Sequence, residues 1–282
     1  MTGAHEFSIL TGMFESRSRK SILPDHFWIW GPPGFCLLGM ALVHFADANL
    51  DLFLSINEVS LYTGDMFWAV LTFFSDGLVS FVILLPWIKR RPQIIWAVLL
   101  ATILSTVFSQ GVKRLVNVAR PPQALPAEAF HLIGPDWGHY SFPSGHASMI
   151  FILAGVFSFL TSKRWLRSIL ISAASIVAIS RIAVGVHWPL DVLAGAAIGW
   201  SAAWLGLFLS RHSQWGYSEA GRKILGLILL GCCLLLFVVD YTGYENIMIF
   251  QRSIAFIFFF LGSYEYLKVF GIFLFSKSGS SR

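Results

Sequence analysis

The chain has 282 residues, of which 56% are hydrophobic and only 12% charged, with a mean hydropathy of +0.70. Soluble domains are about 25% charged, so a globular core of this length cannot bury the apolar surplus, and part of it must face lipid. The formal net charge of +5 comes from short basic clusters between apolar runs. That pattern follows the positive-inside rule and argues against nucleic acid as a partner.

Eight apolar segments are long enough to predict membrane-spanning helices, which need about 20 residues each. The predicted spans are residues 27–45, 67–88, 93–112, 147–162, 168–184, 191–209, 224–240 and 253–275. The second contains Ser75-Asp76-Gly77 and the eighth contains Glu265 and Lys268, so both are interrupted by polar groups. Asp76 is interpreted as a structural hydrogen-bonding residue. The expected fold class is all-α, a polytopic membrane helical bundle.

The charges of the loops predict the orientation in the membrane. With the N-terminus in the cytoplasm, eight spans place the basic clusters at 89–91 and 163–167, and those around residues 211–223, on the cytoplasmic side. Residues 46–66, on the opposite side, hold four acidic residues and no Lys or Arg. The sequence therefore predicts a multi-pass protein of the plasma (inner) membrane with both termini cytoplasmic.

Polar segments gather at the outer ends of the central predicted spans, where basic residues are otherwise disfavoured. Lys113 and Arg120-Pro121 follow the third span, and Pro143-Ser144-Gly145-His146 opens the fourth. Arg181 ends the fifth span, His187 follows it, and Asp191 opens the sixth. The topology brings eight residues to one membrane face: Lys113, Arg120, Ser144, Gly145, His146, Arg181, His187 and Asp191.

These residue types suit a phosphoryl group. Three cations, two of them planar guanidiniums, form a cage for a dianion. Ser144 and Gly145 lie at a helix start, where exposed N–H groups and the helix dipole favour an anion. Lysine and arginine around a single carboxylate would repel a divalent cation, so no metal and no cofactor are expected.

Two histidines remain for the two roles that phosphoryl transfer through a covalent intermediate requires. His187 has the carboxylate of Asp191 four residues on, which can hold its ring tautomer. His187 is therefore expected to be the nucleophile and His146 the proton donor. The other loop histidines, His131 and His139, are interpreted as solvated surface residues.

The three segments resemble the signature of the type 2 phosphatidic acid phosphatase superfamily. That signature reads Lys, six residues, Arg-Pro; then Pro-Ser-Gly-His; then Ser-Arg, five residues, His, three residues, Asp, and all eleven positions are filled here. The motifs run from Lys113 to Asp191, which is 79 of the 282 residues.

The resemblance implies a six-helix catalytic core and a phosphohistidine mechanism. It assigns catalysis to His187, His146 and Asp191, and phosphate binding to the remaining five residues, Lys113, Arg120, Ser144, Gly145 and Arg181. The expected organisation is a cytoplasmic tail at 1–26, a phosphatase core at 27–209, and a C-terminal membrane hairpin and tail at 210–282. The family pattern does not account for this hairpin.

The expected activity is hydrolysis of a lipid phosphate or pyrophosphate at the extracytoplasmic (periplasmic) face. Phosphatidic acid, phosphatidylglycerol phosphate, undecaprenyl pyrophosphate and lipid A 1-phosphate all remain open as substrates. Two alternatives also remain: a lipid phosphotransferase that uses the same phosphohistidine, and a non-enzymatic transporter or scaffold. The sequence does not predict the oligomeric state.

Overall fold

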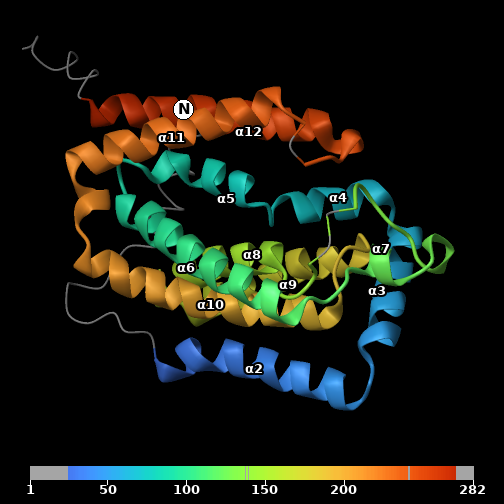
Figure 1. The fold of residues 1–282 in the computed structure, drawn as a ribbon. Helices are drawn as coiled ribbons and strands as arrows, with labels where there is room; N and C mark the ends of the chain where they lie inside the picture. Colours follow the sequence, from blue (N-terminus) through green and yellow to red (C-terminus); the bar gives the residue numbers. More distant parts are fainter. Residues whose placement is uncertain (1–24, 137, 139, 241, 271–282) are drawn as a thin grey trace, which may run out of the picture.

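The computed structural model describes residues 25–270 except Trp137, His139 and Tyr241. This part of the chain is helical and holds no strand; Figure 1 shows long helices running side by side, with α3 across one end. The long and short α-helices are α2 (His26–Phe45), α3 (Asn49–Thr63), α4 (Asp65–Phe73), α5 (Gly77–Leu84), α6 (Pro92–Val116), α7 (Pro121–Ala124), α8 (Gly145–Leu160), α9 (Arg164–Ala183), α10 (Pro189–His212), α11 (Glu219–Val238) and α12 (Met248–Val269). Single 3-10 turns lie at η1 (Leu85–Trp87), η2 (Ala127–Ala129), η3 (Trp215–Tyr217) and η4 (Glu245–Ile247).

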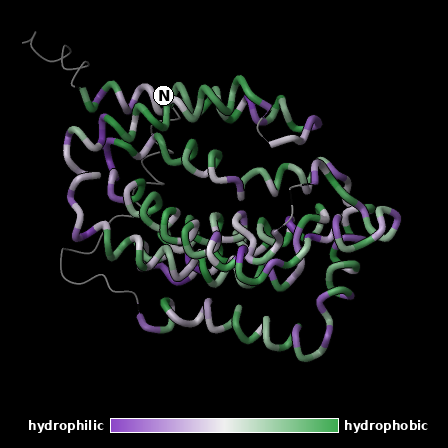
Figure 2. The backbone as a smooth tube through the Cα atoms, in the orientation of Figure 1, coloured by the Kyte–Doolittle hydropathy of each residue, from purple (hydrophilic) through white to green (hydrophobic). Residues whose placement is uncertain are grey.

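The expected all-α membrane bundle is confirmed, and each of the eight predicted spans coincides with a helix or a bent helix pair. Within the described part, α2, α6, α9, α10, α11 and α12 are long and apolar enough to cross a membrane. The stretch from α4 to η1 would be a seventh span, bent by 62°, and α8 is a shorter apolar helix. Hydrophobic residues run along α11 and α12, and hydrophilic residues gather at the turns (Figure 2). The end of the eighth predicted span, 271–275, lies outside the described residues.

The bend in the second span arises at Asp76. Its Oδ1 accepts hydrogen bonds from the backbone N–H groups of Leu78 (2.8 Å) and Val79 (3.2 Å), and so caps the start of α5. An Asp side chain that satisfies these amides favours a new helix start over continuation of α4. The predicted structural role of Asp76 is therefore confirmed, and the span is broken at that residue.

Residues 46–66, expected only as an outer connection, contain the 15-residue helix α3. Its buried Asn57 donates to the carbonyls of His131 (2.7 Å) and Ala183 (2.8 Å) and accepts from the His131 N–H (2.8 Å). The imidazole of His131 lies 2.8 Å from Asp65 Oδ1, so it is paired rather than simply solvated. Asn57 thus joins α3, the loop after α7 and the end of α9. His139 lies outside the described residues.

Small residues bring α8 and α10 unusually close together. A Cβ on Gly195 would lie 2.4 Å from the carbonyl oxygen of Ser144, and one on Gly199 only 2.1 Å from that of Ser148. Glycines four residues apart share one helix face, and in membranes they allow backbones to approach closely. This contact places the start of α8, with its Pro-Ser-Gly-His motif, beside Asp191 at the start of α10.

Helices α11 and α12 form the C-terminal hairpin, packed against α5 and η1 (Figure 1). The connection between them is held by Gln251, whose side chain is fully buried. Gln251 Nε2 donates to the carbonyls of Leu236 (2.7 Å) and Val239 (2.8 Å), and its Oε1 accepts from Thr242 Oγ1 (3.0 Å). Three hydrogen bonds from one buried amide therefore fix the hairpin tip.

Candidate active site

The eight residues that the sequence singled out all lie at one end of the bundle. Lys113 is in the last turn of α6, Ser144 caps α8, Arg181 is in the last turn of α9, and Asp191 is in the first turn of α10. His146 on α8 lies within electrostatic range of Arg181, His187, Arg120 and Lys113.

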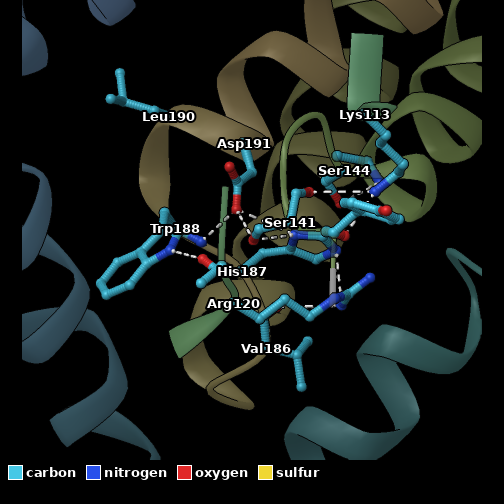
Figure 3. A network of polar contacts seen from close by, with 12 residues as sticks. Lys113, Arg120, Ser141, Ser144, Val186, His187, Trp188, Leu190 and Asp191 are labelled. Carbon is cyan, nitrogen blue, oxygen red and sulfur yellow. Dashed lines mark hydrogen bonds and ion pairs between the residues drawn. The ribbon is translucent and has the colours of Figure 1, made fainter. Parts of the chain in front are cut away.

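The centre of the site is the pair His187 and Asp191, each 1% exposed. Asp191 Oδ2 lies 3.2 Å from His187 Nδ1 and accepts from the backbone N–H of Trp188 at 2.8 Å. The hydroxyl of Ser141 donates a short hydrogen bond to the same oxygen and lies 3.4 Å from His187 Nδ1. Figure 3 shows these contacts converging on the carboxylate. A carboxylate at Nδ1 holds the ring proton there, so the Nε2 lone pair faces the other way.

The surroundings of His187 favour the neutral form of its imidazole. Burial, and then the positive charges of Arg120, Arg181 and Lys113, lower the pKa of His187 well below its ordinary value of 6.5. Its Nε2 lies 3.3 Å from Nη1 of Arg120, which also donates to the carbonyl of Val186 (3.2 Å). At neutral pH the ring is therefore unprotonated at Nε2, as a nucleophile requires.

The residue Arg181 is only 1% exposed, yet some N–H donors of its guanidinium have no hydrogen-bond partner among the described residues. Nη1 donates to Thr72 Oγ1 (2.5 Å) and lies 3.5 Å from the hydroxyl of Tyr244. Nε and Nη2 are buried and have no hydrogen-bond partner in the described part of the chain, and the same holds for Nε of Arg120. Buried cationic N–H groups without partners are costly, and an oxyanion would satisfy them.

The start of α8 departs in one detail from the expectation. The N–H of Ser144 donates to the carbonyl of Asp191 (3.0 Å), so it does not face an anion. Ser144 Oγ accepts from the N–H of Ala147 (3.3 Å), which leaves its own O–H free to donate. A side chain at Gly145 would meet open space, and Nζ of Lys113 donates to the carbonyls of Tyr140 (3.0 Å) and Ser141 (3.3 Å).

Two cavities open beside His146. The smaller, about 140 Å³, is lined by Thr72, Phe73, Asp76, His146, Arg181, Thr242 and Tyr244. The larger, about 430 Å³, runs along α6 and α8 and is lined by Lys113, Gly145 and several hydroxyl groups. Asp76 and His146 form a wall common to both, with Asp76 Oδ2 3.7 Å from His146 Nε2. At that distance a carboxylate attracts a protonated imidazole.

Sequence reasoning missed two residues of this region and the location of a third. Ser141 bridges His187 and Asp191, but it lies outside the signature and carries no pattern of its own. Tyr244 reaches Arg181 only through the packing of a hairpin 63 residues further along the chain. Asp76 was interpreted as a structural hydrogen-bonding residue because it is an acid within an apolar span, but its position beside His146 depends on the bend. Among the described residues, no group of three or more His, Cys, Asp and Glu is placed to hold a metal ion.

The fold defines a multi-pass membrane protein, with Lys, Arg and His side chains gathered around a buried carboxylate at one end of its helices. Residues 94–215 match the family model of the PAP2 superfamily. An undecaprenyl-diphosphatase from Sulfolobus acidocaldarius is 32% identical over 54% of this chain and 73% of its own length. A lipid A 4'-phosphatase from Bacteroides thetaiotaomicron is 28% identical over 58% of this chain and 78% of its own.

Among solved structures, LpxE from Aquifex aeolicus is similar with a TM-score of 0.50 and 32% identity. The match covers 57% of this chain and 94% of that one. The chain belongs to the PAP2 superfamily, among its membrane lipid phosphatases. The family and enzyme class expected from the signature are thereby confirmed.

Proposed function

We propose that the protein removes a phosphoryl group from a membrane lipid through a covalent phosphohistidine on His187, without a metal ion. The observation that best supports this is the buried His187–Asp191 pair, with Nδ1 held by the carboxylate and Nε2 beside a guanidinium. A buried, neutral, oriented imidazole next to cations with unused donors is what attack on a phosphate monoester requires.

The proposed reaction has two steps. His187 Nε2 attacks phosphorus in line with the leaving oxygen; the phosphorus–oxygen bond breaks, and His146 donates a proton to that oxygen. Water, deprotonated by His146, then attacks the phosphohistidine and releases inorganic phosphate, which restores both histidines. Asp191 stabilises the positive ring of the intermediate and orients His187.

In this proposal, fixed positive groups stabilise the negative charge that develops on the phosphoryl oxygens. Lys113, Arg120 and Arg181 supply cations, while the Ser144 hydroxyl and the open backbone at Gly145 supply further donors. These groups are positioned before substrate arrives, so they stabilise the transition state without reorganisation. In this proposal they replace a metal ion.

The proposed substrate is a lipid phosphate whose tail stays in the bilayer while its headgroup enters the site from the extracytoplasmic face. The named relatives act on undecaprenyl diphosphate and on lipid A, which are both such amphiphiles. Residues 27–209 would form the catalytic core, 1–26 a cytoplasmic tail and 210–282 an accessory hairpin. A cysteine at Ala124, the last residue of α7, should react with a membrane-impermeant thiol reagent outside intact cells. If this cysteine were labelled only after lysis, the site would lie on the cytoplasmic side, opposite to the proposed orientation.

The mechanism is tested by phosphate release from lipid phosphates in detergent, with EDTA present throughout. Wild type should stay active, and His187→Ala and His146→Ala should each lose activity by a factor of about 10³ or more. His212→Ala, at the far end of α10, is the matched control and should match wild type. Loss of activity in EDTA, or survival of activity in both site variants, would refute the proposal. A phosphorylated lipid product in place of free phosphate would instead indicate a transferase.

A further inference from the structure

The C-terminal hairpin reaches the site although it lies beyond residues 94–215, the part that matches the family model. Its tip is fixed from two sides. Gln251 ties the tip to the end of α11, and the ring of Phe250 packs edge-on against Phe73 and Phe74 of the α4 end, with centroids 5.5 and 6.0 Å apart. The tip is therefore held against the helix that leads into Asp76.

Two side chains of this tip line the smaller cavity. Tyr244 is 4% exposed and Thr242 is 5% exposed. The Tyr244 ring lies over Gly134, where an added Cβ would come within 2.3 Å of it, so any side chain at residue 134 would displace the ring. The Tyr244 hydroxyl accepts from Arg181 Nη1 at 3.5 Å, and its own proton is free for another acceptor.

The smaller cavity, like the larger one, lies on the leaving-group side of the proposed reaction, because His146, the proposed proton donor, forms part of the wall of each. The lining of the smaller cavity includes the hydroxyl-bearing residues Thr72, Thr242 and Tyr244, together with Asp76 and Phe73. Protein hydroxyls can donate to or accept from the hydroxyl groups of a ligand, and an ionised carboxylate accepts from them.

The charges of the two cavities disfavour a leaving group that is itself a phosphate. Among the described residues, Lys113 and Arg181 are the Lys and Arg side chains that line either cavity, and both are assigned to the transferred phosphoryl group. A second phosphoryl group would lie beside the Asp76 carboxylate without a cation of its own, and like charges repel strongly in a site shielded from water.

The larger cavity is also lined by hydroxyl groups that can form hydrogen bonds with a ligand. Its wall carries six hydroxyl side chains: Ser75, Thr102, Ser105, Thr106, Ser109 and Ser148. The Ser109 hydroxyl is buried and has no hydrogen-bond partner among the described residues. A buried polar group without a partner favours a ligand that supplies one.

We propose that the hairpin tip and these cavities select a lipid monophosphate whose leaving group bears hydroxyls, of the glycerol or sugar type, over a lipid pyrophosphate. The Tyr244 and Thr242 hydroxyls bind the headgroup next to the leaving oxygen, and Asp76 excludes a second phosphoryl group. This inference rests on the proposed phosphatase function of the same site.

The test compares kcat/KM in detergent micelles for four substrates. Phosphatidylglycerol phosphate represents a glycerol headgroup, lipid A 1-phosphate a sugar, phosphatidic acid a monophosphate without free hydroxyls, and undecaprenyl pyrophosphate a charged leaving group. The kcat/KM of wild type should be higher by about tenfold or more on one of the first two substrates than on phosphatidic acid or undecaprenyl pyrophosphate. The better of the first two substrates identifies the headgroup.

Three variants separate selection from general damage. Tyr244→Phe and Thr242→Val should each lower the preference for the hydroxyl-bearing substrate over phosphatidic acid, by about tenfold for one lost hydrogen bond. Asp76→Asn should raise the relative rate on the pyrophosphate. Tyr266→Phe removes a phenol at the opposite end of the hairpin, where it donates to the Lys223 carbonyl, and should leave the preferences unchanged.

Several outcomes would overturn the inference. A wild-type preference for undecaprenyl pyrophosphate would refute the charge argument while leaving the phosphatase function intact. If kcat/KM fell equally on all four substrates in both tip variants, with thermal stability matching that of Tyr266→Phe, the tip would not select the headgroup. No phosphate release from any substrate would refute the proposed function itself.

Discussion

Replacement of Asp191 by asparagine tests how much the buried carboxylate contributes to the proposed reaction. The side chain keeps its shape and its position between Trp188 N–H and Ser141, but it loses the negative charge 3.2 Å from Nδ1 of His187. At that distance and an effective dielectric of about 20, the attraction between opposite charges is about 5 kcal/mol.

The substitution does not lose all of this energy, because the amide oxygen can still accept from Nδ1. A hydrogen bond to a charged partner contributes about 1.5–3 kcal/mol, and we expect a loss of about 3 kcal/mol in transition-state stabilisation. The corresponding fall in kcat is about 10²-fold. The loss should appear in kcat more than in KM, because the ring becomes positive only as the phosphohistidine forms.

The assay is steady-state phosphate release together with acid-quenched trapping of the phosphoenzyme with labelled substrate. Asp191→Asn should lower the rate of phosphoenzyme formation and leave the melting temperature in detergent close to that of wild type. A fall in kcat of less than fivefold in a folded variant would refute the assigned role of the carboxylate. Unchanged phosphoenzyme formation with slowed release would move that role to the second step.

Two further predictions follow from the electrostatics and the packing. Because burial and nearby cations lower the pKa of His187, the acidic limb of the kcat/KM profile should lie below pH 6.5; Arg120→Gln removes one of these charges and should move the limb to higher pH. A limb at or above pH 6.5 in wild type, or a downward movement in the variant, would contradict this assignment. Gly199→Val places a side chain against the Ser148 carbonyl, 2.1 Å from the new Cβ, and should destabilise the protein by about 2–4 kcal/mol, whereas Gly231→Ala on α11 meets open space and is the control. Equal melting temperatures for the two variants would show that the close approach of α8 and α10 is not required.

The sequence predicted the long helices and the grouping of the eight candidate residues at one end of the bundle because both depend on local patterns. Apolar runs of span length specify membrane helices, and the signature spacings place polar residues at helix ends. The break at Asp76 was less accessible, since an apolar run gives the length of a span and not its straightness. Helix α3 was missed because acidic residues are interspersed along it and its apolar positions do not form a long run.

The remaining features depend on contacts between distant segments. Ser141 contacts the His187–Asp191 pair because the loop after α7 returns to the start of α10, and Tyr244 reaches Arg181 because the hairpin packs on α4. Neither contact produces a periodic pattern in the amino-acid sequence from which it could be predicted. The backbone approach at Gly199 is similar: a glycine in an apolar helix signals that a neighbour comes close, but not which neighbour.

The hydrogen bonds of Asn57 have a consequence for how the site end moves. One amide side chain joins α3 to the loop at His131 and to the last turn of α9, and the Ile133 N–H adds a bond to the Val184 carbonyl. The loop at 131–133 therefore cannot lift away alone without leaving a buried amide unsatisfied. Its backbone amides should exchange with solvent deuterium at the same rate as the end of α9, as one cooperative unit.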